Sequence, residues 1–94
     1  MADLYRTKAD YHVFEADRLT SANTESLSVW CDGVFVEEHD ALKHEITFAA
    51  INVPTPDGME RAQEGDWLVK SATGNFYIVK HDKFKHIFEV MIDS

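Results

Sequence analysis

Short apolar runs rich in β-branched and aromatic residues, separated by polar turn-forming residues, recur along the chain and are typical of β-strands. They predict strands over residues 11–16 (YHVFEA), 33–39 (GVFVEEH), 44–53 (HEITFAAINV), 67–71 (WLVKS) and 75–80 (NFYIVK). The last two runs are separated by a short connection that contains a glycine, which favours a β-hairpin. The second and third runs could pair as another hairpin.

Between the first two predicted strands, apolar residues recur at helical spacing. Leu27, Trp30 and Cys31 lie three and four residues along from one another, and residues 20–23 (TSAN) supply short polar side chains that can cap a helix. The pattern predicts one short amphipathic helix with Gly33 as its left-handed stop. At the end of this helix, Cys31 is expected to pack inward.

The remaining segments complete the prediction of a small α+β domain. Phe84, Ile87 and Phe88 have helical spacing, so residues 81–88 are expected to form one or two helical turns. Two prolines and an Asp-Gly pair predict a loop at 54–58 (PTPDG). Further expectations are a fraying terminus that leads toward a strand (1–10), extended segments (59–62 and 89–92) and a turn (64–66). The fold class expected is α+β, with one or two short helices packed on a small, mostly antiparallel β-sheet.

The length of the chain bounds its organisation. A chain of 94 residues has room for one hydrophobic core, so residues 1–94 are expected to form a single domain, with residues 1–10 as a candidate flexible segment. The single cysteine, Cys31, cannot form an internal disulfide, and the sequence has no apolar run of signal-peptide or membrane-spanning length. These features favour a reducing cytoplasm and no membrane partner.

The chain is strongly acidic. It has 17 Asp and Glu against nine Lys and Arg, a formal net charge of −8. Such a surface repels phosphate backbones, so no direct nucleic-acid binding is expected, although solubility alone also explains an acidic composition. A basic segment interrupts this pattern and either balances the acidic body or docks a carboxylate or phosphate. It consists of Lys80, His81, Lys83, Lys85 and His86.

No residue pattern points to catalysis. The histidines (His12, His39, His44, His81 and His86) lack the spacing of metal ligands on one helix face or one strand face, and no cysteine pair completes a set. The sequence has no nucleophile elbow, no phosphate-binding glycine loop and no dinucleotide fingerprint. We therefore expect a non-enzymatic protein with no catalytic residues, metal or cofactor.

Residues 65–88 (GDWLVKSATGNFYIVKHDKFKHIF) resemble the C-terminal signature of a family of small uncharacterised bacteriophage and prophage proteins. The matching residues are Gly65, Asp66, Trp67, Leu68, Val69, Lys70, Gly74, Phe76, Tyr77, Lys80, Asp82 and Phe84. Residues 30–33 (WCDG) are similar to a Trp-Cys-Gly-Gly region of the family, whereas Asn75, Ile78 and His81 depart from the signature. The resemblance implies an accessory protein made in the cytoplasm of the bacterial host, and it implies no particular reaction.

Two functions remain open at this point. The first is binding to a host protein or an antiviral defence complex, which the protein would modulate or inhibit, with acidic mimicry of nucleic acid as one route. Its candidate residues are Glu37, Glu38, Asp40, Glu60 and Glu64, with Tyr77 or Phe35 as an aromatic anchor.

The second function is a small-ligand module for a nucleotide or another anion, formed by the C-terminal hairpin. Its candidate residues are Trp67, Lys70, Tyr77 and Lys80. An open sheet edge also leaves a homodimer possible.

Overall fold

A computed structural model of the chain describes residues 3–20, 22–40 and 45–91, and the side chains of residues 37–40 and 45–49 lie outside this description. The elements in chain order are β1 (Asp3–Thr7), β2 (Val13–Arg18), α1 (Thr24–Trp30), β3 (Val34–Asp40), β4 (Glu45–Thr55), β5 (Gly58–Gln63), β6 (Trp67–Lys70), β7 (Phe76–Val79), α2 (His81–Ile87) and β8 (Phe88–Val90).

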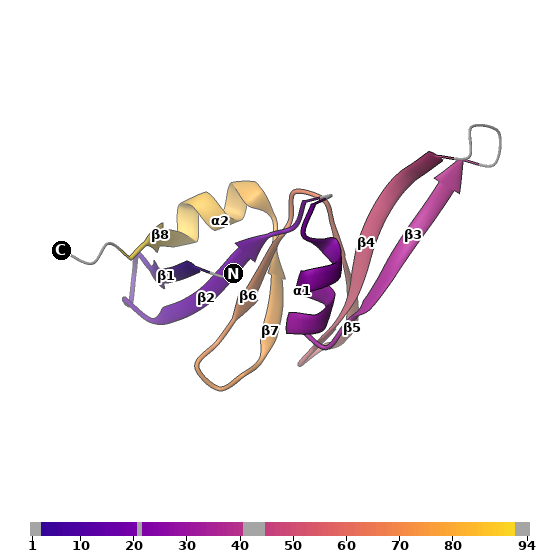
Figure 1. The fold of residues 1–94 in the computed structure, drawn as a ribbon. Coiled ribbons are helices and arrows are strands. Elements are labelled where there is room, and N and C mark those ends of the chain that lie inside the picture. Colours follow the sequence, from indigo (N-terminus) through magenta and orange to yellow (C-terminus); the bar gives the residue numbers. More distant parts are fainter. Residues whose placement is uncertain (1–2, 21, 41–44, 92–94) are drawn as a thin grey trace.

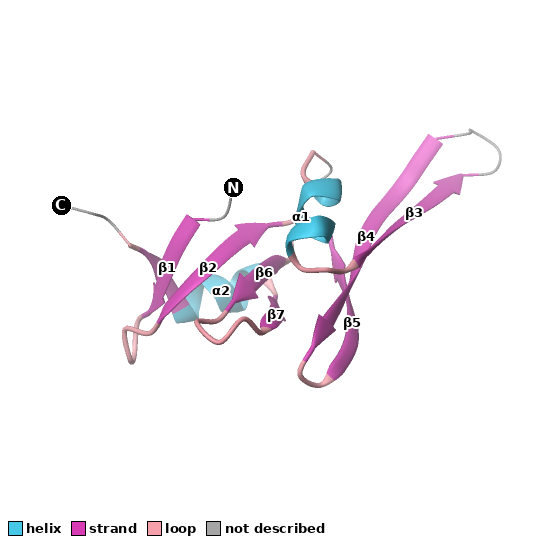
Figure 2. Ribbon diagram, turned by 60° about the horizontal axis from the view of Figure 1, so that its bottom comes forward, coloured by secondary structure: helices cyan, strands magenta, loops and turns pink. Residues whose placement is uncertain are grey.

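The strands form two antiparallel sheets, which confirms the α+β class but divides the single sheet that was expected. One sheet has the order β7-β6-β2-β1-β8, and the other has the order β3-β4-β5. Helix α2 lies over the five-stranded sheet, and α1 lies between the two sheets (Figure 1 and Figure 2). The β3–β4 hairpin extends away from the rest of the molecule (Figure 1), and the molecule is 50 Å long as a result.

Two hydrophobic clusters hold these layers together. The first lies between the sheets, where Leu27 of α1 packs with Ile51 of β4 and Leu68 of β6. The second lies under α2, where Phe84 packs against Ala16 and Val69 of the five-stranded sheet. Each cluster removes apolar side chains from water, and together they join both helices to the sheets.

Both predicted hairpins are confirmed by the strand register. In the C-terminal hairpin, Trp67 pairs with Val79 and Val69 pairs with Tyr77. The β3–β4 hairpin pairs Val34 with Asn52 at its inner end. The helical turns expected at 81–88 are also present as α2. Within α2, Phe84 is buried and Ile87 is exposed.

The N-terminal residues contribute more to the fold than the sequence indicated. Strand β1 pairs with both β2 and β8, so it lies inside the five-stranded sheet. Its aromatic residue, Tyr5, packs edge-on against Trp67 and Phe84, with ring centroids 5.4 and 5.0 Å away. The strand was not evident because its sequence (DLYRT) mixes charged and apolar residues, and one of its two partners, β8, lies far along the chain.

The loop expected at residues 54–58 is shorter than predicted, because β4 continues through Pro54. This residue pairs with Met59 of β5, and the turn consists of residues 56 and 57 alone. Strand β3 pairs with β4 only as far as Asn52. Pro54 therefore lies where β4 has no β3 partner, and its missing N–H group removes no hydrogen bond on that side.

The end of α1 differs from the prediction that Gly33 is the left-handed stop. Asp32 has the positive φ of 55°. The N–H of Gly33 donates to Ser28 O at 2.8 Å, and the N–H of Asp32 donates to Val29 O at 3.3 Å, which together form a Schellman ending. Gly33 is required for a different reason, since a Cβ atom there would lie 2.6 Å from Asn52 O and 2.8 Å from Ile51 Cγ2.

These two roles can be separated by mutation. We expect Gly33→Ala to lower the free energy of unfolding by about 1–3 kcal/mol, because the added methyl group meets the backbone of β4. Asp32→Gly should change the free energy of unfolding by less than about 1 kcal/mol. Glycine removes the left-handed strain at residue 32, and this gain offsets the extra conformational entropy that glycine gives the unfolded chain. Urea unfolding measures both values. A loss for Gly33→Ala no larger than that for Asp32→Gly would contradict the close approach of β4 to Gly33.

Candidate functional site

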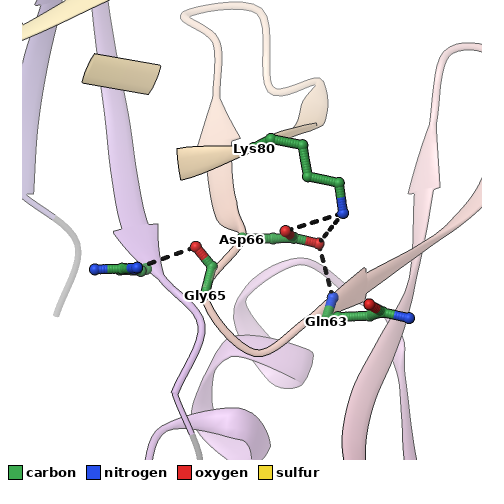
Figure 3. Close-up of polar contacts among 5 residues, drawn as sticks. Gln63, Gly65, Asp66 and Lys80 are labelled. Carbon is green, nitrogen blue, oxygen red and sulfur yellow. Dashed lines mark hydrogen bonds and ion pairs between the residues drawn. The ribbon is translucent and has the colours of Figure 1, made fainter. Parts of the chain in front are cut away.

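The turn between β5 and β6 contains the Gly-Asp-Trp start of the C-terminal signature. The side chain of Asp66 is 8% exposed, and its two carboxylate oxygens each lie 3.0 Å from Lys80 Nζ. Asp66 Oδ2 also accepts a hydrogen bond from the Gln63 N–H at 2.9 Å (Figure 3). Lys80, one of the predicted anion-binding residues, is thus paired with a carboxylate of its own chain.

Backbone contacts fix the same turn to the end of β2. The Leu19 N–H donates to Asp66 O and the Gly65 N–H donates to Leu19 O, each at 2.8 Å. Arg18 Nε donates to Gly65 O at 3.1 Å. Gly65 has a φ of 95°, a conformation that side-chain-bearing residues rarely adopt. The Gly-Asp pair therefore has a structural role in joining the two sheets.

Trp67 has a structural role as well. Its ring stacks on Phe84 of α2 with a centroid distance of 3.8 Å and an interplanar angle of 1°. Its indole Nε1–H donates to His81 Nδ1 at 3.1 Å, and this contact orients the imidazole. These interactions attach α2 to the five-stranded sheet, and they cover the ring face that stacks on Phe84 and the indole N–H group.

The other two predicted ligand residues lie on opposite faces of the hairpin. Val69 pairs with Tyr77, and Lys70 pairs with Phe76. Because successive residues of a strand point to opposite faces, Lys70 and Tyr77 are on different sides of the sheet. Lys70 lines a separate hollow of about 280 Å³ together with residues of β1 and β2. The structure thus does not bring Trp67, Lys70, Tyr77 and Lys80 into one pocket.

The predicted acidic set is only partly described. Glu60 lies in β5, and Glu64 lies in the turn that follows it; both side chains are exposed. Glu37, Glu38 and Asp40 belong to β3, but their side chains lie outside the described part of the chain. Of the two proposed aromatic anchors, Phe35 is half-buried in β3 and Tyr77 is exposed at the rim of a groove.

This groove, which we call the α2 groove, has a volume of about 540 Å³. It lies on the face of the five-stranded sheet that carries α2, and its lining comes from all five strands, the β6–β7 connection and the end of α2. The lining residues are Thr7, Phe14, Val69, Ser71, Thr73, Tyr77, Ile78, Val79, Ile87 and Phe88. Among the described residues, none of those that line it is charged.

Exposed apolar side chains mark the rim of the α2 groove. Ile87, at the end of α2, is 43% exposed, whereas its neighbours in the helical pattern, Phe84 and Phe88, are buried. Tyr77, which also lines the groove, is 39% exposed. Sequence reasoning named Tyr77 but not the groove, since its lining comes from segments that are far apart in the chain. The one local signal was Ile87, which continues the apolar pattern of α2 without being covered.

Cys31 is the one thiol of the chain, and it packs in the cluster between the sheets. Its side chain is 1% exposed, and burial is the main cause that raises the pKa of the thiol. The charge of Asp32 acts in the same direction. Both effects disfavour the thiolate, which is the nucleophilic form.

The described side chains include no group of three or more His, Cys, Asp or Glu residues that could hold a metal ion. Of the helices in the described ranges, neither has the length and apolar character to cross a membrane. No protein-family model, no curated protein and no solved structure matches this chain. The similarity of residues 65–88 to bacteriophage proteins therefore stays a prediction.

The Asp66 turn leads to a stability prediction. Asp66→Ala should lower the free energy of unfolding by about 2–3 kcal/mol, because it leaves the Gln63 N–H without its acceptor. Lys80→Met should cost less than about 1 kcal/mol, because the lysine is largely exposed and Asp66 keeps its bond to Gln63. Chemical denaturation of the two variants measures the difference. Equal losses would show that the ion pair, not the backbone contact, carries the stabilisation.

The burial of Cys31 leads to a second prediction. At pH 8 the native thiol should react with a disulfide reagent more than about a hundredfold more slowly than the thiol of the urea-unfolded protein. The rate is followed by the absorbance of the released thiolate, with Cys31→Ala as the baseline. Similar rates in the two states would contradict the packing described for Cys31.

Proposed function

We propose that this protein is a non-enzymatic binding protein that attaches to another protein through the α2 groove. The observation that carries the proposal is an uncharged, largely apolar groove with Tyr77 and Ile87 exposed at its rim. Exposed tyrosine beside a pocket is a frequent anchor of protein interfaces, because it buries a large ring at low entropic cost and keeps a polar hydroxyl. In a bacteriophage context the partner would be a host protein or an antiviral defence complex, which binding modulates or inhibits.

A nucleotide or anion fits the α2 groove less well. The polar groups that the lining offers are the hydroxyls of Thr7, Ser71, Thr73 and Tyr77. Of the lysines that were candidates for phosphate binding, Lys80 pairs with Asp66, and Lys70 lies on the opposite face. Neither of these two lysines can therefore supply the cation that would offset the lost hydration of a phosphate group bound in the groove.

Acidic mimicry would use a different surface. Exposed Glu60 and Glu64 lie on β5 and on the turn after it, and neither residue lines the α2 groove. Variants of the two surfaces therefore separate the two modes of protein binding.

The experiment is affinity capture from a bacterial host with tagged wild-type protein and three variants. Tyr77→Arg places a charge at the rim of the α2 groove, and it should reduce capture of the partner by at least about tenfold. Val29→Arg introduces the same side chain at an exposed position of α1, and it should capture as much partner as wild type. The double variant Glu60→Gln, Glu64→Gln should also retain the partner. Thermal unfolding confirms that each variant is folded.

Two results would reject this proposal. If Tyr77→Arg captures the partner at wild-type stoichiometry, the α2 groove is not the binding site. If the glutamine double variant loses the partner while Tyr77→Arg keeps it, the acidic surface carries the interaction instead.

A further inference from the structure

The α2 groove crosses the strands obliquely, because its lining residue in β2, Phe14, lies two residues further along the strand register than Val69 of β6. Helix α2 follows β7 and leads into β8, so it crosses the five-stranded sheet from one edge to the other (Figure 1). The groove takes Tyr77 from β7, Val69 from β6, Phe14 from β2 and Thr7 from β1, which are successive neighbours in the sheet. Ile87 from the last turn of α2 completes it. The groove is therefore the part of this face that α2 leaves uncovered.

A helix suits this direction better than a strand. A strand added to the sheet lies parallel to its neighbours, whereas this groove crosses them. Four strands at about 4.8 Å spacing span roughly 14 Å, so an oblique path across them has room for at least about ten helical residues at 1.5 Å each. The same face already receives a helix of this kind, because α2 buries Phe84 and lies beside the groove.

The charges at one end of the α2 groove indicate the chemistry of the segment that would bind there. Next to the lining residues Thr7 and Ile87 are two exposed lysines, Lys8 and Lys85. The Lys8 N–H donates to Ile87 O, and Lys8 Nζ donates to Lys85 O, each at 2.8 Å. The ammonium group of Lys8 is thus held beside the groove in a chain with a net charge of −8. Carboxylates of a bound segment are complementary to this end.

We propose that the α2 groove receives a short amphipathic helix of the partner, which lies beside α2 with its apolar face on Tyr77, Phe14 and Ile87 and with acidic residues at the end that meets Lys8 and Lys85. This inference rests on the proposed function and names the chemistry of the partner.

The experiment selects ligands without assuming the partner. A random library of peptides of about 16 residues, long enough for a marginal helix, is panned on the full protein and depleted on Tyr77→Arg. We expect enriched peptides with apolar residues at positions i, i+3 or i+4, and i+7, and with an excess of Asp and Glu toward one end. Binding of the strongest peptide is then measured by fluorescence anisotropy at low and high salt.

Two lysine variants test the charged end. Lys8→Glu should weaken the peptide by about twofold to tenfold, and the loss should shrink at high salt. Lys70→Glu makes the same charge change on the opposite face of the sheet, and it should leave the affinity unchanged. The melting temperatures of both variants show whether folding is intact.

Several outcomes would overturn the inference. These are enriched peptides with alternating apolar residues, enriched peptides that are basic, equal effects of the two lysine variants, or no enrichment over Tyr77→Arg. A wild-type dimer in sedimentation that Tyr77→Arg converts to a monomer would show that a second copy fills the groove. If a partner is captured through Tyr77 but no helical peptide is enriched, the proposed function stands and the inference about a helix fails. If helical peptides are enriched but Tyr77→Arg captures the partner as well as wild type does, the proposed function fails instead.

Discussion

The carboxylate of Asp66 holds the point where the chain passes from one sheet to the other. Three residues connect β5 of one sheet to β6 of the other. Asp66, the last of the three, binds Gln63 at the end of β5 and Lys80, the residue before α2. The other passage, from β2 toward α1, is hydrogen-bonded to the same turn through Leu19. Because both passages meet here, the turn sets how the sheets lie and where the cluster of Ile51 and Leu68 can form.

This constraint explains why the C-terminal signature does not itself form a site. Gly65 adopts a positive φ, Asp66 anchors the turn, Trp67 stacks on α2, and Lys80 neutralises Asp66. Each of these residue types also suits ligand binding, so the sequence supported both readings. The structure shows that their polar groups and ring faces contact the protein itself, and Tyr77 is the member of the predicted ligand set that lines the α2 groove.

Local patterns predicted the elements whose partners are near in sequence, as in the β6–β7 hairpin and helix α2. They missed features that depend on distant partners. Strand β1 is stabilised by β8, which lies more than 80 residues away in register pairs such as Tyr5 with Val90. Pro54 remains in a strand because β3 has already ended, and Gly33 is needed because the backbone of β4 approaches it. The α2 groove is a non-local feature of the same kind.

The size of α2 accounts for the groove. A helix that crosses the strands covers a band about 10–12 Å wide, whereas the six residues of β2 run about 20 Å, so one helix cannot cover the whole face that it packs on. Apolar residues such as Phe14 and Ile87 nevertheless line the uncovered part, where polar residues would be expected on a face that only meets water. Folding of the single chain gains little from an exposed Ile87, and the helix proposed to bind in the groove would cover this side chain.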